Sequence, residues 1–100
     1  MFETSKQIGV FEMNGRKVID NEAYALYEDG TEEFLHNGFT HRVDGPALIN
    51  GKGKYWMQMN LLHREDGPAV ELTTGEKFYY LHGMEMTRQQ FRNEMRNRAA

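Results

Sequence analysis

Two His–Asp pairs with the same spacing are the strongest candidates for chemistry in this sequence. His41 and Asp44 recur as His63 and Asp66, three residues apart in each pair. Such a pair can supply metal ligands, or a general base with a carboxylate that orients it. The competing interpretation is structural, because an Asp before Gly-Pro accepts backbone N–H bonds in a bend and a catalytic site is usually single. We favour the structural interpretation and expect no catalytic residue and no metal site.

The pairs belong to two nearly identical segments, HRVDGPA at 41–47 and HREDGPA at 63–69, called here the first and second link segments. We expect each Arg to bridge to the Asp of the neighbouring unit, and each His to pack beneath an aromatic ring. Gly and Pro exclude these segments from central strands, so they are bends. The expected structural residues are His41, Arg42, Asp44, Gly45, Pro46, His63, Arg64, Asp66, Gly67 and Pro68.

Other catalytic chemistry has little support. The chain has no cysteine, which excludes disulfides, thiolate metal sites and cysteine nucleophiles. Ser5 is the only serine, and no glycine cluster has phosphate-binding spacing. We therefore expect a protein that is not an enzyme and needs no cofactor.

The link segments are part of a repeat of 22 residues. Ala25, Ala47 and Ala69 recur at this spacing, and so do the aromatic residues Phe34, Trp56 and Phe78. Asn-Gly and Asp-Gly pairs between short apolar runs are typical of tight hairpin turns. The sequence predicts a mainly β fold, an antiparallel meander of 22-residue hairpin repeats with roughly six to eight strands.

One domain is expected over residues 1–100, since this length leaves no room for a second. We predict an N-terminal hairpin over 8–20, repeat units over 24–86 and a helix over 87–98. Thr87 followed by Gln90 is a capping-box pattern. Phe91 and Met95 lie four residues apart, so they share a face, which we expect to cover the last edge of the sheet.

With its HRxDGPA segments, the chain resembles small phage and bacterial proteins that carry such units. It is more distantly similar to MORN-like (YwqK-type) β-hairpin repeats. The resemblance covers residues 24 to about 91 and includes Gly83, Thr87 and Phe91 of a terminal motif; it departs at Met59-Asn60, where Asn-Gly is typical. It implies a binding scaffold, and a phage origin implies a modulator or inhibitor of a host protein.

Charge is distributed unevenly along the chain. Residues 1–87 carry eight Lys/Arg and fourteen Asp/Glu, a net charge of −6, whereas residues 88–100 carry four Arg and one Glu, a net charge of +3. The acidic body favours a basic surface on a protein partner. The predicted partner-binding residues are Glu28, Asp29, Glu32, Glu33, Phe34, Trp56 and Phe78.

Two alternative hypotheses remain open. The basic residues Arg88, Arg92, Arg96 and Arg98, together with an aromatic sheet face, could bind nucleic acid. A repeat protein of this kind could also assemble with itself through an open sheet edge. The sequence has no apolar run of signal-peptide or membrane-span length, so we expect no membrane contact and a cytoplasmic location, which is the host cytoplasm for a phage protein.

Overall fold

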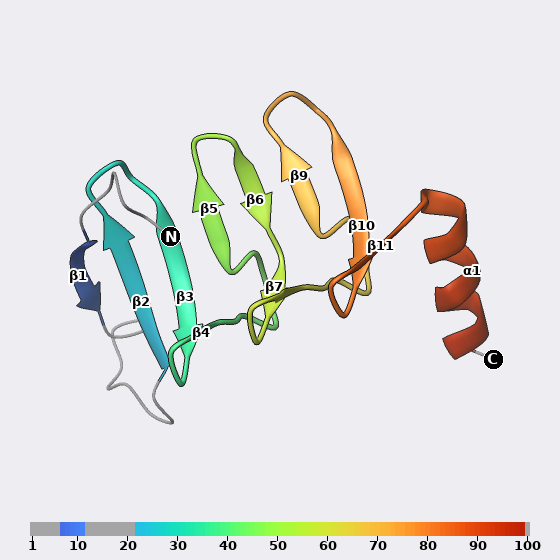
Figure 1. The fold of residues 1–100 in the computed structure, drawn as a ribbon, viewed down its shortest axis with the longest axis horizontal. Helices are drawn as coiled ribbons and strands as arrows, with labels where there is room; N and C mark the ends of the chain where they lie inside the picture. The colour runs from blue at the N-terminus through green and yellow to red at the C-terminus, as the bar shows by residue number, and fades with distance from the viewer. Residues whose placement is uncertain (1–6, 12–21, 100) are drawn as a thin grey trace.

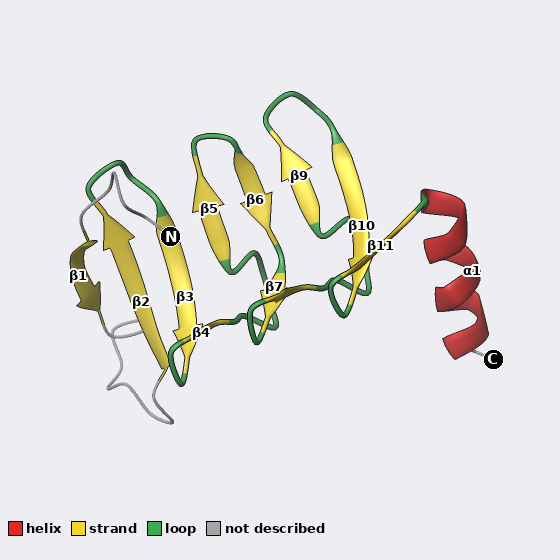
Figure 2. Ribbon diagram, in the orientation of Figure 1, coloured by secondary structure: helices red, strands yellow, loops and turns green. Residues whose placement is uncertain are grey.

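A computed structural model describes residues 7–11 and 22–99, with side chains from residue 23 onward. The described residues form eleven strands and one helix (Figures 1 and 2). They are β1 Gln7–Phe11, β2 Glu22–Tyr27, β3 Glu32–His36, β4 Phe39–Thr40, β5 Leu48–Asn50, β6 Gly53–Tyr55, β7 Met57–Gln58, β8 Leu61–Leu62, β9 Val70–Leu72, β10 Lys77–Leu81, β11 Met84–Met86 and α1 Arg88–Ala99.

The predicted mainly β fold, with an antiparallel meander-like sheet and one C-terminal helix, is confirmed. The expected six to eight strands are too few, because a second set of short hairpins adds strands that the count of turns did not separate. Of the hairpin expected over 8–20, the structure describes only β1, which pairs with β2; residues 12–20 lie outside the described part.

Neighbours in the large sheet follow one another along the chain. The order is β1-β2-β3-β5-β6-β9-β10-β11, with β4 paired to β3, and every pairing is antiparallel. Figure 1 shows the upper hairpins β2–β3, β5–β6 and β9–β10 with their loops at the top. The lower hairpins β3–β4, β7–β8 and β10–β11 have their turns at the opposite ends of the strands. Each link segment runs from a lower hairpin to the next upper one.

The lower hairpins turn on two successive residues with positive φ. These are Asn37-Gly38 (52° and 82°), Met59-Asn60 (49° and 69°) and His82-Gly83 (52° and 80°). Two-residue hairpin turns of the I′ type require this geometry. Met59 is unusual here, since its side chain disfavours the left-handed region. Hydrogen bonds to the preceding segment hold this turn. Thr40 and Asn60 exchange two hydrogen bonds, and Met59 N donates to His41 Nδ1.

The third unit is one residue longer than the second. Leu48 pairs with Tyr55 in β5–β6, whereas Val70 pairs with Phe78 in β9–β10. The extra residue lies in the loop between β9 and β10, and everything after it is displaced by one position. A fixed spacing of 22 therefore holds only up to that loop.

The core of this thin sheet is small. Ala25, Ala47 and Ala69 are fully buried, and no large side chain among the described residues reaches the same burial. Small side chains at these positions let successive segments approach closely. From residue 23 to 99, five large apolar side chains are exposed, Phe39, Val43, Met59, Leu61 and Met84.

Helix α1 closes the last edge of the sheet beyond β11 (Figure 1). The predicted capping box is present: Gln90 N donates to Thr87 Oγ1 at 3.1 Å, and Thr87 N donates to Gln90 Oε1 at 2.8 Å. Phe91 is buried against Tyr79, with ring centroids 4.9 Å apart. No helix in the described part of the chain is long and apolar enough to span a membrane.

Candidate partner-binding groove

Arg42 and Arg64 each place the guanidinium over an aromatic ring. Arg42 Cζ is 4.0 Å from the centroid of Phe34, and Arg64 Cζ is 3.9 Å from the centroid of Trp56. A planar, weakly hydrated guanidinium is suited to this stacking. The histidines, each expected beneath an aromatic ring, lie against other imidazoles: the ring centroids are 5.4 Å apart for His41 and His36 and 4.4 Å apart for His63 and His82. The rings of Phe34 and Trp56 are covered by the arginines.

The third aromatic position is taken by Tyr79, not by Phe78 as predicted. Arg42 N donates to Met57 O, and Arg64 N donates to Tyr80 O, so the residue that corresponds to Trp56 precedes Tyr80. The ring of Tyr79 is covered by Phe91 of α1. The longer β9–β10 loop causes this displacement. Phe34 and Trp56 are covered by guanidinium groups, whereas Tyr79 is covered by the phenyl ring of Phe91.

Each guanidinium is bound by the aspartate of its own link segment. Arg42 Nε donates to Asp44 Oδ1 at 3.1 Å, and Arg64 Nε donates to Asp66 Oδ1 at 2.8 Å. The hydrogen bond from Arg64 holds the pKa of Asp66 below its ordinary value. The expected bridge to the Asp of a neighbouring unit is wrong, because the bend that follows returns the carboxylate to its own arginine.

The Gly-Pro pair completes this bend. The Nη1 groups of the two arginines donate to Pro46 O at 3.3 Å and Pro68 O at 3.0 Å. A Cβ on Gly45 or Gly67 would lie 3.0 Å from the guanidinium carbon. A side chain at either glycine would therefore displace the guanidinium by a few tenths of an ångström from its place over the ring.

The histidines hold the lower hairpins. His41 Nδ1 accepts the N–H of Met59 at 3.0 Å, and His63 Nδ1 accepts the N–H of His82 at 2.9 Å. In neutral His63 the proton is thus on Nε2, where Glu65 Oε2 lies 3.2 Å away. His63 is 5% exposed and both its nitrogens are engaged. No His–Asp hydrogen bond forms in either link segment, so the geometry does not build the acid–base pair considered from the sequence.

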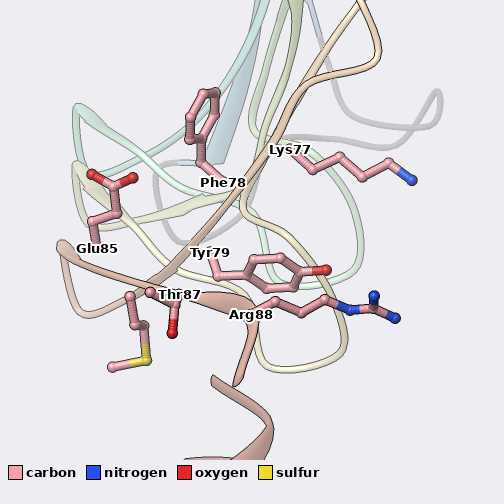
Figure 3. A pocket seen from close by; sticks show the side chains of 7 residues that line it. Lys77, Phe78, Tyr79, Glu85, Thr87 and Arg88 are labelled. Carbon is pink, nitrogen blue, oxygen red and sulfur yellow. The ribbon is translucent and has the colours of Figure 1, made fainter. Parts of the chain in front are cut away.

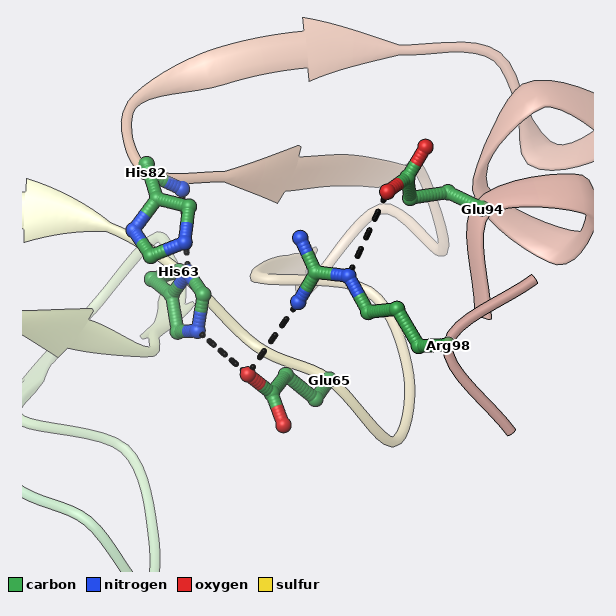
Figure 4. Close-up of polar contacts among 5 residues, drawn as sticks. All are labelled: His63, Glu65, His82, Glu94 and Arg98. Atoms are coloured by element: carbon green, nitrogen blue, oxygen red, sulfur yellow. Dashed lines mark hydrogen bonds and ion pairs between the residues drawn. The ribbon is translucent and has the colours of Figure 1, made fainter. Parts of the chain in front are cut away.

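Glu65 ties the second link segment to the helix (Figure 4). Its Oε2 accepts from Arg98 Nη1 at 3.4 Å, and Arg98 Nε donates to Glu94 Oε2 at 3.3 Å. The two link segments differ at one position, which is Glu65 in the second segment and Val43 in the first. The sequence carried this signal as a single mismatch between the two copies.

A groove lies between the two link segments and is called here the link groove. Its volume is about 730 Å³, and it is lined by Arg42, Val43, Asp44, Gly45, Pro46, Trp56, Gln58, His63, Arg64, Glu65 and Asp66. Its arginines are the stacked ones, 29% and 20% exposed, whereas Asp44 and Asp66 are 87% and 85% exposed. Sequence reasoning selected the motif residues as structural and missed Val43, Gln58 and Glu65 as groove residues.

The predicted acidic cluster does not form one surface. Glu28 and Asp29 are exposed in the loop between β2 and β3. Glu32 accepts a hydrogen bond from the hydroxyl of Tyr24 at 2.8 Å. Glu33 is 6% exposed, where it accepts hydrogen bonds from Tyr27 and Thr40. Glu33 therefore cannot contribute to a surface contact, because strand alternation turns it into the sheet beside Ala25.

Of the predicted cationic residues, Arg88, Arg92 and Arg96 are exposed on α1, and Arg98 is paired as described above. A hollow of about 510 Å³ lies where β10 and β11 meet the start of α1. Figure 3 shows Phe78 and Glu85 on one side of it, with Lys77, Tyr79 and Arg88 extending to the other. The mixed charges leave this hollow without a clear ligand preference.

No group of three or more metal-ligating side chains occurs among the described residues. Comparison with protein-family models, with curated proteins and with solved structures found no match to this chain. The HRxDGPA resemblance thus stays a prediction from the sequence, and the geometry of the link groove carries the functional argument.

Proposed function

We propose that this protein is a non-enzymatic protein-binding module whose contact surface is the link groove. The proposal depends on one observation: some side chains of the groove hold the fold, and others are exposed to solvent. The histidine and the arginines of the groove, His63, Arg42 and Arg64, are engaged in holding the fold. What the groove offers to solvent is a shaped surface with an exposed Val43 and exposed carboxylates.

The choice against catalysis follows from the same contacts. A general base needs a free nitrogen within reach of a substrate proton. His63 accepts a backbone N–H with one nitrogen and faces Glu65 with the other. The two link segments also repeat the same bonds 22 residues apart, as expected for a scaffold.

The HRxDGPA resemblance favours a phage-encoded modulator or inhibitor of a host protein. The net charge of −6 over residues 1–87 favours a target with a basic surface. The alternative of nucleic-acid binding rests on the exposed Arg88, Arg92 and Arg96 on α1. It predicts an affinity that falls steeply with salt concentration.

Affinity capture from a bacterial lysate tests the proposal, with nuclease-treated and untreated halves read by mass spectrometry. Val43→Tyr fills the groove without adding charge, and Val43 is 74% exposed, so the fold should tolerate the change. Lys52→Tyr places the same side chain on the exposed loop of the β5–β6 hairpin and is the matched control.

A protein captured near equal stoichiometry in both halves, lost with Val43→Tyr and kept with Lys52→Tyr, supports the proposal. Capture that disappears after nuclease treatment replaces it with nucleic-acid binding. Bait alone, with a mass in light scattering above that of a monomer, replaces it with self-assembly. Capture unaffected by Val43→Tyr overturns the link groove as the contact surface.

A further inference from the structure

The most exposed charged groups of the link groove are carboxylates, although Asp44 and Asp66 are each ion-paired with the arginine of the same link segment. Asp44, Asp66 and Glu65 are 87%, 85% and 60% exposed, while the guanidinium-bearing side chains of Arg42 and Arg64 are 29% and 20% exposed. Each arginine lies on a ring and donates to a proline carbonyl. A ligand therefore meets the carboxylates of both walls first.

The molecule already places a cation on this groove. Arg98, which reaches over from α1, lies with Nη1 3.4 Å from Glu65 Oε2 (Figure 4). Arg98 Nε donates to Glu94 Oε2 on the same helix. An intramolecular guanidinium from the helix thus reaches Glu65 at this end of the groove, whereas Asp44 and Asp66 are paired with Arg42 and Arg64 of their own link segments.

The first wall adds an apolar surface. Val43 is 74% exposed and stands at the position that corresponds to Glu65, beside Pro46 in the same wall. The aliphatic stems of lysine and arginine pack on such surfaces while their charged ends reach carboxylates. Acidic segments and nucleic acids lack this match, because they would face Asp44 and Asp66 at the groove walls.

We propose that the link groove binds an extended, arginine- or lysine-rich segment of a partner protein. The cations of that segment pair with Asp44, Asp66 and Glu65, and one stem lies on Val43. Arg98 competes for Glu65 at the end of the groove nearest the helix. This inference rests on the proposed function and specifies the chemistry of the partner.

The test varies one charge at Val43, which makes no hydrogen bond in the fold. Val43→Glu gives the first link segment the residue of the second, and Val43→Lys places a cation at the same point. The probe is a fluorescein-labelled peptide of alternating arginine and glycine, followed by anisotropy. Trp56 is the single tryptophan of the chain and lines the groove, so its emission reports occupancy independently.

We expect Val43→Glu to tighten binding about threefold and Val43→Lys to weaken it about threefold, which is the range for one exposed charge pair. Arg98→Gln should also tighten binding, because it releases Glu65. Glu76→Gln changes an exposed carboxylate at the β9–β10 loop and should leave the affinity unchanged. A peptide with glutamate in place of arginine should leave Trp56 emission unchanged.

Equal affinity of the arginine peptide for Val43→Glu and Val43→Lys overturns the inference, and so does tighter binding of the glutamate peptide. If the arginine peptide fails to bind while Val43→Tyr still abolishes protein capture, the inference fails and the proposed function stands. If capture is also insensitive to Val43→Tyr, the proposed groove itself is wrong.

Discussion

Replacement of Arg64 by alanine should destabilise the fold more than the same replacement of Arg42 in the first link segment. Arg64 donates to Asp66, to the carbonyl of Pro68 and to Glu71 Oε2 at 3.1 Å, and it covers Trp56. A partly exposed cation–π contact contributes about 0.5–1 kcal/mol. Each exposed ion pair adds about 0.2–1 kcal/mol, and the bond to the carbonyl about 1 kcal/mol. The loss should reach about 2–3 kcal/mol.

For a domain of this size, that loss lowers the unfolding temperature by about 10–20 °C. Urea unfolding followed by Trp56 fluorescence measures it directly, because the covered ring becomes solvent-accessible on unfolding. Arg64→Lys keeps the charge but loses the planar fork, so it should recover less than half of the lost stability. The native emission of Arg64→Ala should shift to longer wavelength even without urea.

Arg42→Ala is the matched comparison. Arg42 covers Phe34 and contacts Asp44 and Pro46 at longer distances, and Ile49 occupies the place that corresponds to Glu71. Its loss should therefore cost less than that of Arg64. If Arg64→Ala unfolds within about 0.5 kcal/mol of the unmodified protein, a typical effect of an ordinary surface change, or if Arg42→Ala costs more, the stacked arginines do not support the sheet as argued.

Three further predictions follow from individual contacts. Gly53→Ala should cost about 1–3 kcal/mol or more in urea unfolding, because a Cβ there lies 2.5 Å from the carbonyl oxygen of Glu71 in the neighbouring strand; unchanged stability would mean that β6 and β9 are further apart. Thr87→Ala should cost about 1 kcal/mol and increase hydrogen exchange in the first turn of α1, whereas Thr87→Ser should not; equal exchange in both variants would remove the cap from the argument. Burial, aided by the hydrogen bond to Glu33, raises the pKa of Tyr27 to about 12. Because this folded pKa exceeds the unfolded value near 10, its contribution to stability is complete below pH 10 and is lost as the pH rises toward 12. The pKa of Tyr24 is raised too, by burial and by its hydrogen bond to Glu32, so absorbance titration should show more than one late-ionising tyrosine, and the step near pH 12 should disappear in Tyr27→Phe; its persistence would assign that step elsewhere.

Much of the fold was accessible from local sequence rules. The hairpin signal at Asn37-Gly38 and the cap at Thr87 depend on residues close in sequence, and both form as expected. Met59-Asn60 shows the limit of such rules. Its turn is held by His41, 18 residues earlier, so no local pattern would select it.

The site was less accessible, because its contacts cross between units. The stacking of Arg64 on Trp56 depends on how the link segment bends, which the spacing of residues does not give. Tyr79 replaced Phe78 because one inserted residue changes the register after β9. Charge composition alone predicts a surface position for Glu33, whereas its pairing with Ala25 in the sheet puts it on the buried side.

The order of strands in the large sheet has a consequence for the nascent chain. Every pairing among the described strands joins residues at most 20 positions apart in the sequence, as for Gln7 and Tyr27 in β1 and β2. Such local topology favours fast folding for a β protein, and hairpins can form one after another as the chain leaves the ribosome. The exception is the last edge. Until Phe91 has emerged, Tyr79 lacks the ring that covers it, so the synthesis of α1 determines when the growing sheet stops offering a strand edge to other chains.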